Sequence, residues 1–354
     1  MIEIGISARR SALRVDLEAV AALILNTQTA EGEIPWHSGG KTDPWDHVES
    51  AIGLGIAGHL EPARRAFAWM QANQLEDGSW YSAYRDGLPE DRTRDSNMAA
   101  YIAVGVFHHY LLTRDSTFLE TLWPTVEKAI DFALSLQAPT GEIHWAISPE
   151  GRVDPMALLT GSSSILMSLR CALAIAEQLG VRRPAWRFGM QRLAHAIRYE
   201  RHRFNVTKSR FSMDWFYPVL CGAMRGAEAR RRIEKQWKKF VVEGQGVKCV
   251  SDEPWITIAE TSELCLALDA MDNAPLAETL FSDPAEKSFG WIAEKRFEDG
   301  TFWCGHTIPD MTVWPEEKIT WTNAVVLMAA DALFHLTPAA RFFSHRFWRS
   351  PNGA

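Results

Sequence analysis

The amino-acid sequence predicts an all-α protein in which about six helical hairpins close into a ring, an (α/α)6 barrel or toroid. Three observations lead to this prediction. Apolar residues recur with helical spacing along most of the chain, a turn with glycine and tryptophan recurs between helices, and every second helix begins with polar residues. Strand-like alternation is confined to short stretches such as 246–250.

The expected helices follow one another in pairs. They lie near residues 14–27, 45–59, 62–74, 94–113, 116–137, 158–180, 184–200, 213–223, 227–242, 258–272, 274–295 and 320–335. Helices such as 62–74 and 116–137 have an apolar stripe and a charged face, which is typical of an outer layer. Helices such as 94–113 and 320–335 carry little charge, as inner helices covered on nearly all sides would.

A repeated turn supports this pairing. A helix ends in glutamine, an acidic or polar turn with glycine follows, and a tryptophan closes the motif, as in Gln74-LEDGSW. The motif recurs, once without the glutamine, and ends at Trp36, Trp80, Trp145 and Trp303. Glycine suits a left-handed helix end, and we interpret most of these tryptophans as packing residues between hairpins. Such self-similarity favours one closed array over two unrelated domains.

The polar helix starts predict a binding pocket. They are the segments 43–50, 92–101, 160–168, 212–218, 257–263 and 316–323. If inner and outer helices alternate, all inner helices run in the same direction, and their six starts gather at one mouth of the ring. Helix N-termini favour negative or oxygen-rich ligands. The alternative for any one start is that its Asp, Ser or Thr is an ordinary N-cap.

Bulk properties exclude several classes of function. The chain has 354 residues, is 47% hydrophobic and has a net charge of −7, so we expect a folded protein without a nucleic-acid partner. The basic run 225–240 is interpreted as the solvated face of an outer helix. Five scattered cysteines without metal-ligand spacing indicate reduced thiols, no metal site and a cytoplasmic location. We expect neither a signal peptide nor membrane insertion.

We expect one domain over residues 1–354, with a short N-terminal lead-in and a loosely ordered tail from about 338. The mouth supplies candidates for substrate binding, because carboxylates beside indoles can hold hydroxyl groups while the ring stacks on a sugar face. The candidates for substrate binding are Trp45, Asp46, His47, Glu49, Arg94, Asp95, Asn97, Trp215, Glu263 and Trp321. The alternatives are a capping box at Asp46 and Glu49, and an Arg–Asp pair that fixes a loop.

Four carboxylates are candidates for catalysis. Glu260 lies one helical turn from Glu263, so both can face the pocket, and a buried member of such a pair would have a raised pKa. Asp214 adjoins an indole. Glu316 and Glu317 lie on a loop before the last inner helix, where a carboxylate can activate water. The alternatives are solvated glutamates and an exposed acidic turn.

Three segments resemble the six-hairpin glycosidases, and the glucoamylase-like family in particular. DPWDHVES is similar to that family's first inner helix, which implies that Asp46 contacts the substrate. TGSSSILMS resembles the helix start that follows the family's catalytic acid, and WPEEKITWTN resembles the segment that carries its base, here Glu316 or Glu317. The chain departs from the family at the acid, because Ala157 and Leu158 stand where carboxylates are expected.

The resemblance implies an inverting glycoside hydrolase that acts on a small glycan or glycoconjugate without a metal or cofactor. Asp154, Glu260 or Asp214 can replace the missing acid; the alternative is that the reaction is not hydrolysis. The glycine and tryptophan turns also resemble the α-α toroid of terpenoid cyclases and protein prenyltransferases, although the DxDD and DDxxD motifs are absent. A non-catalytic sugar-binding protein is a third possibility.

Overall fold

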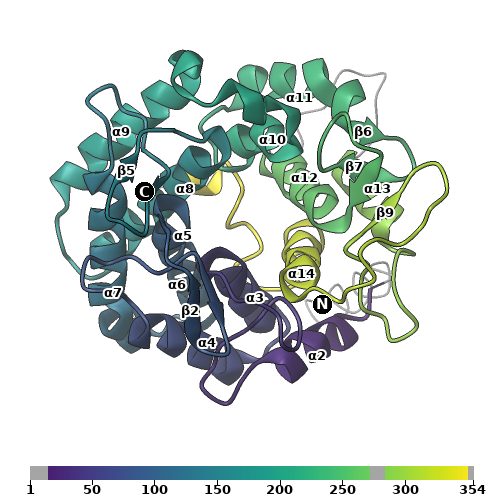
Figure 1. Ribbon diagram of the computed structural model, residues 1–354, viewed down its shortest axis with the longest axis horizontal. Coiled ribbons are helices and arrows are strands. Elements are labelled where there is room, and N and C mark those ends of the chain that lie inside the picture. Colours follow the sequence, from purple (N-terminus) through teal and green to yellow (C-terminus); the bar gives the residue numbers. More distant parts are fainter. Residues whose placement is uncertain (1–14, 272–283, 350–354) are drawn as a thin grey trace, which may run out of the picture.

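The computed structural model describes residues 15–271 and 284–349, and it confirms the all-α barrel (Figure 1). Six inner positions surround the axis, and the outer helices lie around them. The inner helices are α3 (Pro44–Ile56), α5 (Ser96–Ala100) with α6 (Ile102–Thr113), α8 (Leu159–Gln178), α10 (Ser212–Leu220), α12 (Ile258–Ala270) and α14 (Thr320–Phe334). Each packs on the next, and α14 packs on α3, which closes the ring.

The outer layer consists of α2 (Leu17–Thr27), α4 (Leu60–Ala72), α7 (Ser116–Ser135), α9 (Pro184–Tyr199), α11 (Gly226–Phe240) and α13 (Pro284–Ile292). Part of the helix expected at 274–295 lies outside the described residues. The sequence explains the two layers. In α11 one stripe, which includes Ile233, Trp237 and Phe240, is buried, and most of its basic residues cover the solvent face as expected, whereas Arg232 is buried. In α14 nearly every residue from Thr320 to Ala332 is buried.

The repeated turn is a clamp between neighbouring hairpins. The Gln74 amide donates to the carbonyl of Gly78 in its own turn (3.0 Å) and to that of Thr125 in the next outer helix (2.9 Å). Gln28 and Gln137 make the same pair of hydrogen bonds, to Gly32 and Pro62 and to Gly141 and Gly189. A β-carbon on Gly78 would lie 2.2 Å from the Lys128 carbonyl oxygen, so only glycine fits.

The short strands cluster in loops before the inner helices. They are β1 (Ala83–Arg85), β2 (Leu88–Asp91), β3 (Arg94–Asp95), β4 (Ala146–Ile147), β5 (Val153–Asp154), β6 (Val241–Val242), β7 (Gly246–Lys248), β8 (Trp255–Thr257) and β9 (Gly305–Thr307). They form antiparallel sheets in the orders β1-β2, β3-β4-β5 and β6-β7-β8-β9. Because β3 leads directly into α5 and β8 into α12, these sheets hold helix starts in place.

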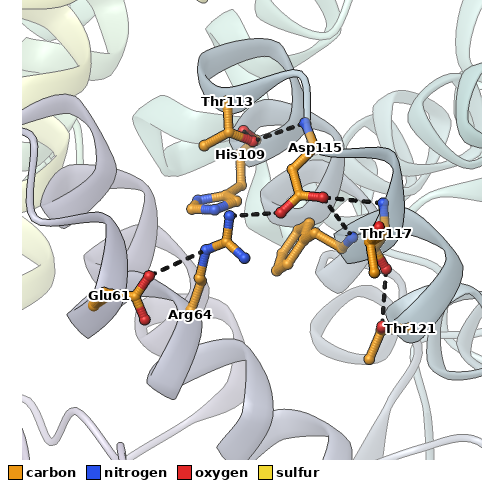
Figure 2. Close-up of polar contacts among 8 residues, drawn as sticks. Glu61, Arg64, His109, Thr113, Asp115, Thr117 and Thr121 are labelled. Carbon is orange, nitrogen blue, oxygen red and sulfur yellow. Dashed lines mark hydrogen bonds and ion pairs between the residues drawn. The ribbon is translucent and has the colours of Figure 1, made fainter.

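Polar contacts also join the outer helices (Figure 2). Asp115 accepts hydrogen bonds from the backbone of Thr117 and Phe118 and so caps α7. The same carboxylate forms an ion pair with the guanidinium of Arg64 from α4, at a nitrogen-to-oxygen distance of 2.7 Å. Arg64 also lies 3.7 Å from Glu61 one turn earlier. One aspartate therefore both starts a helix and attaches it to the preceding hairpin.

The segment after α14 is packed, which corrects the expectation of a loose tail from about 338. Phe342, Phe343 and Trp348 are buried, and the His345 ring bonds to the Val219 carbonyl at 2.7 Å. This yellow segment crosses the middle of the ring in Figure 1. Among the described residues, α8 alone is long and apolar enough to span a membrane, and 83% of that apolar window is buried inside the protein.

Candidate active site

The starts of the inner helices are tied to one another at one end of the barrel. Thr160 at the start of α8 donates its backbone N–H and its hydroxyl to Asp214 at the start of α10 (3.1 and 2.6 Å). The backbone N–H of Thr320, which begins α14, donates to the Trp36 carbonyl at 2.8 Å, just before α3. Residues far apart in the sequence therefore share one mouth.

A cluster of carboxyl groups and aromatic rings forms the floor below this mouth. Glu49 of α3 accepts hydrogen bonds from the Trp45 indole (2.9 Å) and from the Tyr101 hydroxyl (3.2 Å). Glu263 of α12 accepts a short hydrogen bond from the Tyr217 hydroxyl. The Trp45 ring lies 5.5 Å from that of Tyr101 and 5.8 Å from that of Tyr217. Together, Glu49, Glu263 and the two tyrosines line a small cavity on the barrel axis.

Burial disfavours the charged form of the carboxyl groups in this floor. Loss of solvent raises the pKa of Glu49 to about 8, against the opposing effect of the hydrogen bonds from Trp45 and Tyr101. Burial also raises the pKa of Glu263 well above its ordinary value, and the nearby charges of Glu49 and Glu260 raise it further. Glu49 therefore retains its proton near pH 7, and the two carboxyl groups titrate together.

Asp46 lies at the mouth with its pKa raised well above the ordinary range, first by burial and then by the charges of Asp43 and Glu49. Its neighbour Asp43 caps α3 by accepting from the Asp46 backbone at 3.0 Å and holds the Trp36 indole at 2.7 Å. Asp46 is half-buried at the start of α3, beside Trp45, which lines a cavity at the mouth. A protonated carboxylic acid at this position is a proton donor.

Glu260 of α12 is a further carboxyl group near Glu49. Its charge raises the pKa of Glu49, so both groups are within electrostatic reach of each other. The Glu260 side chain is buried, and within residues 15–271 and 284–349 its Oε2 atom has no hydrogen-bond partner. Cys304 lies close by, because the charges of Glu260 and Glu317, together with the larger effect of burial, raise its pKa to about 12. Glu260 and Glu317 therefore approach the same part of the mouth.

The loop before α14 carries Glu316 and Glu317 as exposed residues. Trp314 on this loop is 57% exposed. It is nevertheless held in place, because its N–H donates to the Gly305 carbonyl (3.0 Å) and its carbonyl accepts from the Trp255 indole (2.8 Å). The two indoles meet edge to face at 5.2 Å. This pair is a rigid, solvent-facing aromatic platform beside the mouth.

A second cavity of about 90 Å3 lies between the starts of α3, α5 and α8. Trp45, Asp95, Asn97 and Trp145 line it. Asp95 caps α5 by accepting from the backbone of Asn97 (2.7 Å), and burial raises its pKa to about 6. Trp321 lies 6.2 Å from Trp36, centroid to centroid, and its indole nitrogen has no partner within the described part of the chain.

Two of the predicted binding residues are corrected by the structure. His47 is fully buried, where its Nδ1 accepts from the Ile34 backbone (3.1 Å) and its Nε2 donates to the Ala66 carbonyl (2.9 Å). Burial lowers its pKa to about 4, so it is a neutral structural side chain. Trp215 is also buried, and its ring stacks on Phe240 at 5.2 Å.

Two further candidates have structural partners. Arg94 forms an ion pair with Asp77, which attaches β3 to the repeated turn that precedes Trp80. Asp214 accepts from Thr160, as described above, and its backbone carbonyl accepts from Arg232. Arg94 therefore fixes a loop, and Asp214 joins α8 to α10.

Sequence reasoning missed Tyr101 and Tyr217, although each is a tyrosine in the first turns of an inner helix. Among the described residues, no group of three or more metal-binding side chains is arranged to hold a metal ion.

Comparison with known proteins identifies the family. No family model matches the chain. The chain is 49% identical over 323 residues to the MMP endo-(1,4)-3-O-methyl-alpha-D-mannosidase of Mycolicibacterium hassiacum (strain DSM 44199), covering 91% of this chain and 87% of that protein. The chain belongs to this mannosidase family. It is therefore a glycoside hydrolase that acts on a glycan, and the terpenoid alternative is not favoured.

Solved structures agree with the fold. A glycosidase variant in complex with glucose superposes with a TM-score of 0.67 at 16% identity, covering 93% of this chain and 98% of that one. A GH63 mannosylglycerate hydrolase from Thermus thermophilus gives 0.66 at 12% identity (87% and 98%), and a D-mannose isomerase gives 0.71 at 11% identity (92% and 97%). The six-hairpin glycosidase resemblance inferred from the sequence is thereby confirmed.

Proposed function

We propose that the protein is an endo-acting hydrolase of (1,4)-linked 3-O-methyl-α-D-mannosides, with Asp46 as general acid. The close relationship to the mannosidase of Mycolicibacterium hassiacum supports this substrate class. The observation that carries the mechanism is the half-buried Asp46 carboxyl at the mouth of the barrel, whose pKa is raised well above its ordinary range by burial and by the charges of Asp43 and Glu49. Its proton passes to the glycosidic oxygen as the bond to the anomeric carbon breaks.

We assign the general base to Glu260. An inverting mechanism needs a second carboxylate roughly 6.5–9.5 Å from the acid, which takes a proton from the attacking water. Glu49 couples electrostatically to both groups, since Glu260 raises the pKa of Glu49 and Glu49 raises that of Asp46. The buried Glu260 oxygen without a partner in the described chain is suited to bind that water. Glu317, on the same side of the mouth, is the second candidate for this role, and Glu316 the third.

The aromatic platform supports endo action. An endo-acting enzyme binds sugar units on both sides of the bond that it cleaves, so its site extends beyond one sugar. Trp314 is exposed, rigid and adjacent to the mouth, and an indole face packs well on the apolar face of a sugar ring. Trp321 and Trp45, both half-buried at the mouth, are suited to the units nearer the cleaved bond.

We also propose a cytoplasmic location, which is supported by the five cysteines, all of them reduced.

Variants with matched side chains test this mechanism. Asp46→Asn should reduce kcat strongly on an oligosaccharide but much less on a substrate whose leaving group needs no proton, such as a glycosyl fluoride. Glu260→Gln should reduce the hydrolysis of both substrates, and azide should restore turnover by replacing water as the nucleophile.

Glu316→Gln and Glu317→Gln serve as the comparison set for the base. If azide rescues only the Glu317 variant, the base is Glu317 and the assignment of Glu260 is wrong. Proton NMR of the first product identifies the stereochemistry, and inversion predicts that the β-anomer appears first. Equal loss of Asp46→Asn activity on both substrates would remove Asp46 from the role of acid.

A further inference from the structure

We propose that the cavity of about 90 Å3 beside Trp45 accepts the 3-O-methyl group of a mannose unit, and so selects methylated over unmethylated mannan. This inference rests on the proposed substrate class and deepens it by naming the residues that recognise the methyl ether. Trp45, which directly precedes Asp46 in α3, forms part of the cavity wall.

The size of the cavity matches a substituent. One water needs roughly 10–15 Å3 on the same measure, and pockets that enclose drug-sized ligands have roughly 300–1,000 Å3. A space of about 90 Å3 therefore admits a methoxy group with an edge of its ring, but not a whole oligosaccharide.

One face of α8 supplies a wall with the right chemistry. Leu158, Gly161, Ser162 and Ile165 have the i, i+3, i+4, i+7 spacing of a single helical face, and all four line the cavity. Ile143 adds a further apolar side chain. A methyl group placed against these aliphatic side chains leaves water, which is favourable by roughly 0.8 kcal/mol for each buried CH2-sized group.

The polar groups of the cavity suit an ether and its neighbouring hydroxyl. Ser162 is 2% exposed and Asn97 is 4% exposed. Within residues 15–271 and 284–349, the Ser162 hydroxyl and the Asn97 Oδ1 atom have no hydrogen-bond partner. An ether oxygen accepts but does not donate, so Ser162 is suited to donate to it, while Asn97 Oδ1 accepts from an adjacent sugar hydroxyl. Buried polar atoms without partners are costly, and this sugar edge would satisfy both.

Gly161 offers a minimal test of the cavity. Its backbone lies outside the left-handed region, and an added β-carbon would lie 3.5 Å from the Asn97 β-carbon and 3.8 Å from that of Leu158, which is ordinary contact. Gly161→Ala therefore inserts one methyl group beside two other cavity residues, Asn97 and Leu158, without straining α8. Gly290→Ala in α13 is the matched control, because nothing lies within 4 Å of its added β-carbon.

The experiment compares kcat/KM on an α-(1,4)-mannotetraose and on its 3-O-methylated counterpart. The native enzyme should prefer the methylated substrate by roughly 10–200-fold, which is the range for one methyl-sized group in an apolar pocket. Gly161→Ala should remove most of this preference by slowing cleavage of the methylated substrate, and Gly290→Ala should keep it. In a reciprocal variant, Leu158→Ala should improve cleavage of a 3-O-ethyl analogue relative to the methylated substrate.

The outcomes separate this inference from the proposed function. If the native enzyme cleaves neither substrate, the proposed substrate class is wrong and the inference fails with it. If the native enzyme prefers the methylated substrate but Gly161→Ala keeps the native ratio of kcat/KM values, the proposed function stands and the methyl group binds elsewhere. If the native enzyme cleaves both substrates equally, the proposed function stands and the methyl group is not selected.

Discussion

Replacing Glu49 with glutamine should stabilise the protein at alkaline pH and leave its stability almost unchanged at acidic pH. Glu49 is 3% exposed, and burial raises its pKa from about 4.5 to about 8. In the folded protein the group is neutral up to about pH 8, whereas in the unfolded chain it ionises above about pH 4.5. Ionisation therefore favours the unfolded state increasingly between these two pH values. Glutamine imitates the neutral acid, since its Oε1 atom still accepts from Trp45 and Tyr101.

The magnitude follows from the pKa. At 1.36 kcal/mol per unit, a rise from about 4.5 to about 8 corresponds to roughly 5 kcal/mol, an upper bound because Glu263 and Asp46 titrate with Glu49. The stability difference between Glu49→Gln and the native protein should be near zero at pH 4.5 and grow to several kcal/mol by pH 8.

Urea unfolding at pH 4.5, 6, 7 and 8 measures this difference. The control is Glu61→Gln, because the Glu61 side chain is 81% exposed on α4. The control should follow the native protein at every pH. If Glu49→Gln also follows the native protein from pH 4.5 to pH 8, Glu49 is ionised in the folded state and the raised pKa described above is wrong.

Three further changes test the other contacts. His47→Ala should lower the free energy of unfolding, measured with urea, by roughly 2–5 kcal/mol, because two buried backbone groups lose their partners. If the variant instead loses turnover with unchanged stability, His47 is an active-site residue. Asp115→Ala should lower the urea concentration at the midpoint of unfolding because the cap of α7 is lost, whereas Asp115→Asn should keep most of the native midpoint. Equal shifts of the midpoint in the two variants would contradict the capping role. Trp314→Ala should lower kcat/KM about tenfold on long oligosaccharides, if stacking contributes about 1.4 kcal/mol, and leave kcat/KM on short ones unchanged. An equal loss of kcat/KM on oligosaccharides of every length would contradict a sugar-stacking role for Trp314 away from the cleaved bond.

Local sequence patterns were sufficient to predict the fold. Amphipathic outer helices, weakly charged inner helices and the glutamine–glycine–tryptophan turn are properties of short segments, and each leads to the same ring. The structure adds why the turn recurs: the glutamine binds its own turn and the next outer helix at once. The position of the mouth followed from helix direction alone. Asp46 and Glu260 were therefore predicted to be mouth residues from the sequence.

What the sequence by itself determined is the ring and the end of the ring at which polar groups gather, because helical period and chain direction are local properties. Only the tertiary structure decided which polar groups face the axis. Inner helices are buried on nearly all sides, so their apolar pattern does not indicate how each is rotated. His47 turned out to bind backbone groups behind the barrel wall, whereas Glu49, two residues later, reaches the floor between two tyrosines. That rotation is set by packing between helices distant in the sequence, and the raised pKa values exist only once those helices exclude water.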